Sequence, residues 1–198
     1  MSNKKAIMTR CLDINELRSL YKSRIKKDFP VWERRPLFLL KYLYRNGRYK
    51  CIVIEEDEQI IAYSTFICDE AMDSVLLDYL AVESEKQGRG TGGRLLSIIR
   101  EYWKEKSGLI IECEAPDVAK SESERNIRKR RIDFYIRGGA EKTSVRWGFL
   151  GVDYTILWLP IKLAQANVNI ADDLAMLYSF SLPRIFRSFL MRIFAKRI

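Results

Sequence analysis

Apolar residues alternate with polar ones, run together, or recur at helical spacing along most of this chain, and the pattern predicts its elements. Alternating and continuous apolar runs are typical of strands, and a spacing of three to four is typical of helices. The expected strands are 7–12, 49–55, 59–68, 76–82, 109–113, 143–149 and 152–159. The expected helices are 14–25, 37–45, 94–106, 125–137, 170–178 and one after Pro183.

A glycine-rich turn, 87–93, lies between the apolar strand 76–82 and the helix that follows it. Glycines let the backbone approach a ligand closely, and the free N–H groups and dipole of a helix start favour an anion. A pyrophosphate fits this description, and an ordinary flexible turn is the alternative. The pair Gly93-Arg94 lacks the Lys-Ser/Thr of a Walker loop, whereas a dinucleotide-binding fingerprint stays open.

The strand end Leu80-Ala81-Val82 and the turn together resemble the acetyl-CoA-binding signature of the GNAT superfamily of acyl-CoA-dependent N-acetyltransferases, written Gln/Arg-x-x-Gly-x-Gly/Ala. The resemblance implies an α+β fold with a mixed, mostly antiparallel sheet of six to seven strands, flanked by helices. It also implies that acetyl-CoA lies where strand 76–82 splays from strand 109–113. The residues that it assigns to the cofactor are Leu80, Ala81, Val82, Gln87, Gly88, Arg89, Gly90, Thr91 and Gly92.

Residues 130–140, which overlap the end of the basic stretch 125–137, resemble the second motif of the same family, in which a helix ends in Phe-Tyr and a Gly-Phe follows. Tyr135 matches the family tyrosine that protonates the departing thiolate, and a packed aromatic is the alternative. Ala140 replaces the usual aromatic, and Arg128 occupies the place of a frequent asparagine. We assign Arg128 to cofactor binding, because part of this basic stretch can serve the 3′-phosphate.

Histidine is absent from the chain, so mechanisms that need a Ser-His or Cys-His pair are excluded. A carboxylate in an apolar strand suits proton abstraction, which makes Asp78 the first candidate for the general base. By the period of two it should share a face with Leu76, Leu80 and Val82, and a salt bridge to an arginine is the alternative. The reserve candidates for the base are Glu112 and Glu33.

The length of 198 residues and the 47% hydrophobic content suit one folded unit. We expect an acetyltransferase domain over 1–160 and a C-terminal helical extension over 161–198, packed on the domain or on a partner subunit. No apolar run approaches the ~20 residues of a membrane span, and no secretory signal follows 1–6, so we expect a cytoplasmic protein. Four scattered cysteines without histidine predict free thiols and no metal site.

The formal net charge of +9 implies attraction to polyanions. The leading hypothesis is an N-acetyltransferase that moves the acetyl group of acetyl-CoA to a primary amine of a small molecule or peptide by direct attack. A catalytically silent acyl-CoA-binding module and a basic RNA-associated protein are the alternatives, and nucleic acid is disfavoured because only part of the charge can form one patch. A homodimer and a weak membrane-surface contact through 184–197 are further expectations.

Overall fold

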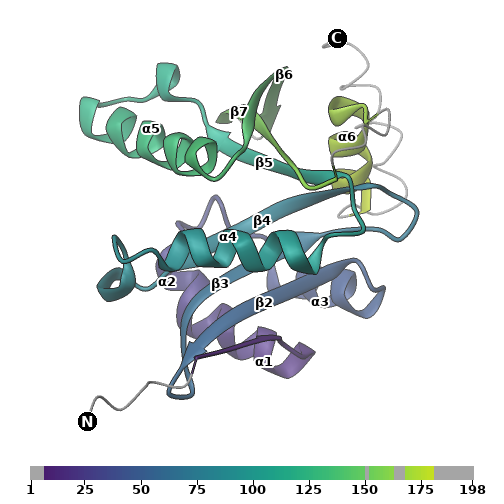
Figure 1. Ribbon diagram of the computed structural model, residues 1–198. Coiled ribbons are helices and arrows are strands. Elements are labelled where there is room, and N and C mark those ends of the chain that lie inside the picture. The colour runs from purple at the N-terminus through teal and green to yellow at the C-terminus, as the bar shows by residue number, and fades with distance from the viewer. Residues whose placement is uncertain (1–6, 150–151, 163–167, 181–198) are drawn as a thin grey trace.

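The computed structural model describes residues 7–149, 152–162 and 168–180, and its strands form one mixed sheet with helices on both faces (Figure 1). The seven strands lie in the order β1-β2-β3-β4-β5-β7-β6. Strands β4 and β5 pair in parallel, and every other neighbouring pair is antiparallel, which confirms the predicted fold class. The strands are β1 (Ile7–Cys11), β2 (Tyr49–Glu56), β3 (Gln59–Ile67), β4 (Ser74–Val82), β5 (Gly108–Glu114), β6 (Glu141–Phe149) and β7 (Val152–Pro160).

Helices connect the strands and cover the sheet, with α4 in front of it and α1, α2 and α3 behind it in Figure 1. The first helix, α1, continues through a π-helical turn (Tyr21–Ile25) into α2. The helices are α1 (Ile14–Leu20), α2 (Lys26–Asp28), α3 (Leu37–Arg45), α4 (Thr91–Tyr102), α5 (Glu122–Arg137) and α6 (Ile170–Phe180), with single 3₁₀ turns at Ser84–Lys86 and Pro116–Val118.

The sheet separates two hydrophobic layers. On one side α1, α3 and α6 bury residues such as Leu17, Leu40 and Leu177. On the other side α4 and α5 bury residues such as Leu95 and Ile132. Because full burial of such a side chain contributes about 1.5–3 kcal/mol, the two layers are the main source of stability.

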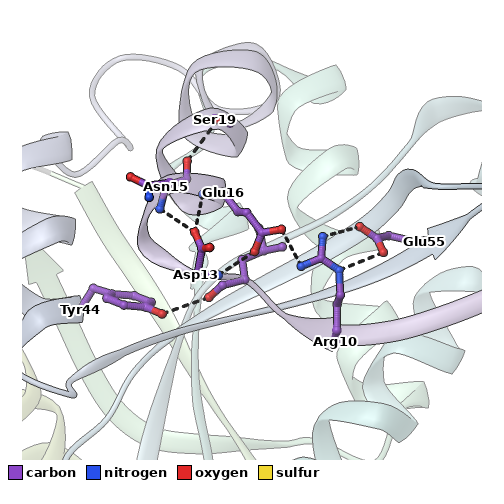
Figure 2. Close-up of polar contacts among 8 residues, drawn as sticks. Arg10, Asp13, Asn15, Glu16, Ser19, Tyr44 and Glu55 are labelled. Carbon is purple, nitrogen blue, oxygen red and sulfur yellow. Dashed lines mark hydrogen bonds and ion pairs between the residues drawn. The ribbon is translucent and has the colours of Figure 1, made fainter.

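Polar contacts fix the start of α1 to the first two strands (Figure 2). The carboxylate of Asp13 accepts hydrogen bonds from the N–H groups of Asn15 and Glu16, at 2.7 and 2.9 Å. The side chain of Glu16 accepts in return from the N–H of Asp13, at 2.8 Å, which completes a capping box. Arg10 of β1 pairs with both Glu16 and Glu55 of β2, so one guanidinium joins the helix start to the sheet.

A bulge in β4 decides which side chains face which layer. The register with β3 shifts between the pairs Thr65–Tyr79 and Phe66–Leu77, so Asp78 is the extra residue. Leu76 consequently packs in the layer of α1, α3 and α6, whereas Leu80 packs in the layer of α4 and α5. The prediction that Asp78 shares one face with Leu76, Leu80 and Val82 is therefore wrong, because the bulge interrupts the period of two.

The two parallel strands stay together over only part of their length. Residues 74–77 of β4 pair with residues 108–111 of β5, and beyond these pairs the strands diverge (Figure 1). Strand β4 continues to Val82 and β5 to Glu114 without pairing to each other. The predicted splay is confirmed, and it leaves the edge of β4 beyond Leu77 unpaired with β5.

The described helices include none that is both long and apolar enough to cross a bilayer. Helix α6 packs its apolar face, including Leu174 and Leu177, into the layer of α1 and α3. The helix expected after Pro183, and with it the membrane-surface segment 184–197, lies outside the described residues.

Candidate active site

A pocket of about 380 Å³ lies at the point where β4 and β5 diverge. The loop 29–36, both strands, α5, β7 and α6 contribute to its wall. The residues predicted for proton transfer all line it, although they come from four separate segments of the chain: Glu33, Asp78, Glu112 and Tyr135. The fold therefore gathers these four side chains around one cavity.

Glu112 of β5 carries the chemistry best suited to a general base. Its Oε2 accepts a hydrogen bond from the hydroxyl of Tyr178, at 2.8 Å. Its Oε1 is shielded from solvent and accepts no hydrogen bond from any residue that the structure describes. Burial raises the pKa of Glu112 to about 7, although the Tyr178 hydrogen bond and the charge of Arg35 both act to lower it. A carboxylate with this pKa can both accept and release a proton near neutral pH.

Asp78 has both carboxylate oxygens engaged. Arg35 donates through Nε to Oδ1 and Tyr49 donates through its hydroxyl to Oδ2, each at 2.7 Å. The ion pair is buried, with 6% of the Asp78 side chain and 14% of the Arg35 side chain exposed. The structure thus has the salt bridge that was the alternative on sequence, and both carboxylate oxygens already have donors within the protein. Of the predicted candidates for the base, Glu112 is the better placed.

Two tyrosines hold the backbone of Arg35, one at its carbonyl and one at its N–H. Tyr21 donates its hydroxyl to the carbonyl of Arg35, at 2.9 Å. The N–H of Arg35 donates to the hydroxyl of Tyr79, at 2.7 Å, and that hydroxyl in turn donates to the carbonyl of Glu33, at 3.1 Å. These bonds place the loop 29–36 over the pocket, so Arg35 and Glu33 reach the site from a segment without regular structure.

Glu33 lies on the pocket wall beside Trp32, whose side chain is 71% exposed. Burial raises the pKa of Glu33 above its ordinary value, and the nearby charge of Glu114 raises it further. Glu33 makes no ion pair within the part of the chain that the structure describes. It remains a second candidate for proton transfer.

Tyr135 of α5 is buried except where it lines the pocket. Burial raises the pKa of its hydroxyl above the ordinary value, so the group keeps its proton at neutral pH. Its neighbour Phe134 lies edge-on to it, with 5.0 Å between the ring centroids. A Cβ added to Gly92 would lie 3.0 Å from the Phe134 ring, and Phe134 also lines the pocket, so this ring links the glycine turn to the pocket.

The glycine turn has the geometry of an anion cradle. Gly88 and Gly90 adopt left-handed φ values of 71° and 83°, and Gly90 is the N-cap of α4 without a side-chain cap. Nothing lies within 4 Å of a Cβ at either glycine. The N–H groups of the first turn of α4 are thus available to a phosphate, and Arg89 and Arg94 are exposed beside them. The turn therefore fits the predicted pyrophosphate of acetyl-CoA.

Two residues predicted to contact the cofactor have partners within the protein. Gln87 donates its side-chain amide to the carbonyl of Val82, at 2.9 Å, which ties the turn to the end of β4. The guanidinium of Arg128 is buried, with Nε 3.1 Å from Glu114, and it donates to Glu124 at 2.6 Å and to the carbonyl of Ala115 at 2.7 Å. These contacts argue against Arg128 as a ligand of the 3′-phosphate, because its guanidinium already pairs with carboxylates of the protein and links α5 to β5.

Among the pocket residues that sequence reasoning missed, Arg35 and Tyr178 act directly on Glu112. Arg35 belongs to a charged turn, 31–36, and nothing in the local sequence predicts that its side chain is buried. Tyr178 follows leucines on the apolar face of α6, so its spacing indicated packing only. In the structure the Arg35 guanidinium lies 4.9 Å from the centre of the Tyr178 ring, and both side chains approach Glu112.

Comparisons with known proteins agree with this geometry. Residues 47–139 match the family model described as an acetyltransferase (GNAT) domain. A GNAT-family protein from Bacteroides thetaiotaomicron is similar to the chain with a TM-score of 0.70 and 18% identity, over 89% of this chain and 99% of that one. The ribosomal-protein-S18-alanine N-acetyltransferase from Escherichia coli gives a TM-score of 0.56 and 18% identity, over 83% of this chain and all of that one.

A third structure, from Salmonella typhimurium, was solved with its cofactor acetyl-CoA and is described as an acetyltransferase. It gives a TM-score of 0.57 and 17% identity, over 83% of this chain and 99% of that one. No curated protein sequence matches the chain significantly. At these identities the structural likeness establishes the fold, and the family model covers the glycine turn, both diverging strands and Tyr135. Residues 47–139 of the chain therefore match a GNAT acetyltransferase domain, and the described structure has the GNAT fold.

Proposed function

We propose that this protein is an N-acetyltransferase that moves the acetyl group of acetyl-CoA to a primary amine by direct attack. One observation carries the proposal: Glu112, with a pKa of about 7, and Tyr135, which keeps its proton, line the same pocket at the gap between β4 and β5. Amine acetylation requires a proton acceptor and a proton donor in one pocket. The similar Salmonella typhimurium structure with its cofactor acetyl-CoA supports the choice of donor.

The glycine turn and the free edge of β4 would hold the cosubstrate. The N–H groups of residues 88–92 and the dipole of α4 suit its pyrophosphate. The backbone around Leu80 and Val82, where β4 no longer pairs with β5, suits the amides of its pantetheine arm. When bound, acetyl-CoA supplies the activated thioester, and the chain supplies position and proton transfer.

Proton transfer is divided between two side chains. The carboxylate of Glu112 takes a proton from the acceptor ammonium, so that the amine can attack the thioester carbonyl. The hydroxyl of Tyr135 gives its proton to the sulfur as the carbon–sulfur bond breaks, and solvent returns it. As the amide forms, the nitrogen loses its second proton to solvent, and Glu112 releases its own proton to solvent. The amine gains the acetyl group, coenzyme A leaves as the thiol, and one proton is released overall.

Removal of the Tyr135 hydroxyl tests the acid. Tyr135→Phe is expected to lower kcat about 10²-fold, because a positioned acid contributes at least this much, while the aromatic ring keeps its packing. The measurement is the release of free thiol from acetyl-CoA in the presence of amines. Tyr42→Phe removes a hydroxyl from the exposed face of α3 and serves as the matched control. An unchanged kcat in Tyr135→Phe would remove this tyrosine from the mechanism.

Substitution in the glycine turn tests the cofactor site. Gly90→Ala is expected to weaken acetyl-CoA binding about tenfold, because a left-handed φ costs an L-residue about 1–2 kcal/mol and the turn must shift to relieve it. Gly93→Ala is the control, since Gly93 lies in the regular helix with open space around it. Isothermal titration calorimetry with acetyl-CoA measures both variants. Equal affinities would show that the turn is not the anion site.

A panel of amines separates the enzyme from a silent binding module. The proposed enzyme binds acetyl-CoA and releases free coenzyme A with at least one class of small or peptide amine. A module that binds acetyl-CoA yet releases no thiol with any amine would contradict the proposed reaction. Absence of acetyl-CoA binding at millimolar ligand would contradict the enzyme and the module together.

A further inference from the structure

Helix α6 brings a hydroxyl to the pocket from a segment that the GNAT family model does not cover. The apolar residues Leu174 and Leu177 anchor the helix in the sheet's hydrophobic layer. This anchoring places the neighbouring Tyr178 over β5, where its hydroxyl donates to Oε2 of Glu112 at 2.8 Å. The ring of Tyr178 also packs against Trp147, at 5.2 Å between centroids. The donor is therefore held in place on more than one side.

The hydrogen bond from Tyr178 acts on one oxygen of Glu112 and leaves the other for chemistry. With Oε2 engaged, the carboxylate cannot rotate freely, and the unbonded Oε1 is the atom that can take a proton. A bond donated to the charged form also stabilises that form against the cost of burial. Tyr178 thus influences both the orientation and the proton affinity of the base.

Other charged or titratable groups near Glu112 come from every element around it. Arg35, before α3, favours the charged form, and Asp78, on β4, disfavours it. These two form an ion pair with each other, so their opposite effects partly cancel. Tyr154 of β7 and Glu114 of β5 line the same pocket. Among these groups Tyr178 is the one that makes a direct hydrogen bond to Glu112.

We propose that Tyr178 is a positioning residue for Glu112, so that α6 is part of the catalytic site and not only a cover for the sheet. This inference rests on the proposed function. It also implies that the GNAT domain matched over 47–139 needs two groups from outside that range, Arg35 and Tyr178, to set up its base.

The test is Tyr178→Phe in the full chain, which keeps the ring against Trp147 and removes only the donor. The pKa of Glu112 is expected to rise by about one unit, because a stabilising bond to the charged form is lost. Titration by ¹³C NMR of glutamate-labelled protein measures this shift without any substrate, and Glu112→Gln assigns the signal. Tyr42→Phe is the control.

The pH dependence of activity is a second, independent measurement on the Tyr178→Phe variant. The acidic limb of kcat/KM should move upward by about the same one unit, with activity recovered at higher pH and acetyl-CoA affinity unchanged. A purely structural role would lower activity at all pH values and leave the Glu112 titration in place. A stronger hydrogen-bond donor should shift the Glu112 pKa the other way. 3,5-Difluorotyrosine at position 178 is such a donor, and it should lower the Glu112 pKa without altering the packing.

Two outcomes overturn the inference and are distinguishable. An unshifted Glu112 titration in a folded, active Tyr178→Phe protein contradicts the positioning role alone and leaves the acetyltransferase intact. A shifted titration in a chain that releases no coenzyme A with any amine contradicts the proposed function and, with it, any catalytic use of Tyr178.

Discussion

Glu112→Gln is expected to lower kcat/KM for the acceptor amine about 10³-fold at neutral pH, because an amide cannot take the proton that a positioned carboxylate base accepts. The amide oxygen can still accept the Tyr178 hydrogen bond, so the pocket should keep its shape. The remaining activity should no longer show an acidic limb near pH 7, since the group that titrates at about 7 is absent. Acetyl-CoA affinity should not change.

The same variant has a predicted effect on stability with a definite sign. Burial raises the pKa of Glu112 above its ordinary value, so the folded protein favours the protonated form. Proton binding to Glu112 therefore adds to the free energy of unfolding. This contribution is fully present below the pKa that Glu112 has in the unfolded chain, and it is lost as the pH rises through about 7. Glu112→Gln should therefore unfold at a higher urea concentration than the parent above pH 7, even though its activity is strongly reduced.

Two further variants complete the test of the base. Glu101→Gln alters an exposed carboxylate on α4 and should leave activity unchanged. Glu33→Gln removes the second candidate, whose pKa is also raised, and we expect a smaller loss than with Glu112→Gln. Near-normal turnover in Glu112→Gln together with inactive Glu33→Gln would transfer the role of base to Glu33.

Arg35→Leu should lower the free energy of unfolding by about 3–5 kcal/mol, because it leaves the buried carboxylate of Asp78 without its cation. The hydroxyl of Tyr49 would remain as the hydrogen-bond donor to Asp78, and one neutral donor does not replace a charge. The effect should be this large because the pair is buried, whereas exposed ion pairs contribute about 0–1 kcal/mol. Urea denaturation followed by circular dichroism measures the change.

The double variant Arg35→Leu, Asp78→Asn separates the lost ion pair from lost packing. An asparagine side chain carries no charge that needs a partner, so the double variant should be more stable than Arg35→Leu alone. The exposed pair Lys104–Glu101 offers the contrast, and Lys104→Leu should change the free energy of unfolding by less than about 1 kcal/mol. A cost of under about 1 kcal/mol for Arg35→Leu would mean that solvent reaches Asp78 and that the site is more open than the structure describes.

Features that depend on near neighbours in the chain were predictable. The apolar periods located α3 at 37–45, and the strands around it to within a few residues, because a helix or strand face is defined by spacing alone. The glycine turn was found because positive φ values select glycine, and two of its glycines have them. The helix after it begins earlier than predicted, at Thr91, because the left-handed Gly90 is already its cap.

The chemistry of the pocket depended on contacts between distant segments. A single bulge at Asp78 interrupts the alternation of side chains along β4. Arg35, 43 positions away in the sequence, forms the ion pair with Asp78. Glu112 is separated from Tyr178 by 66 positions, and no local sequence pattern predicts the hydrogen bond between them. Periodicity, turn geometry and the family motif were therefore enough to name the fold and to locate the glycine turn. The order of the candidate bases followed from burial and hydrogen bonding, because proton affinity is set by neighbours in space, which the order of residues along the chain does not reveal.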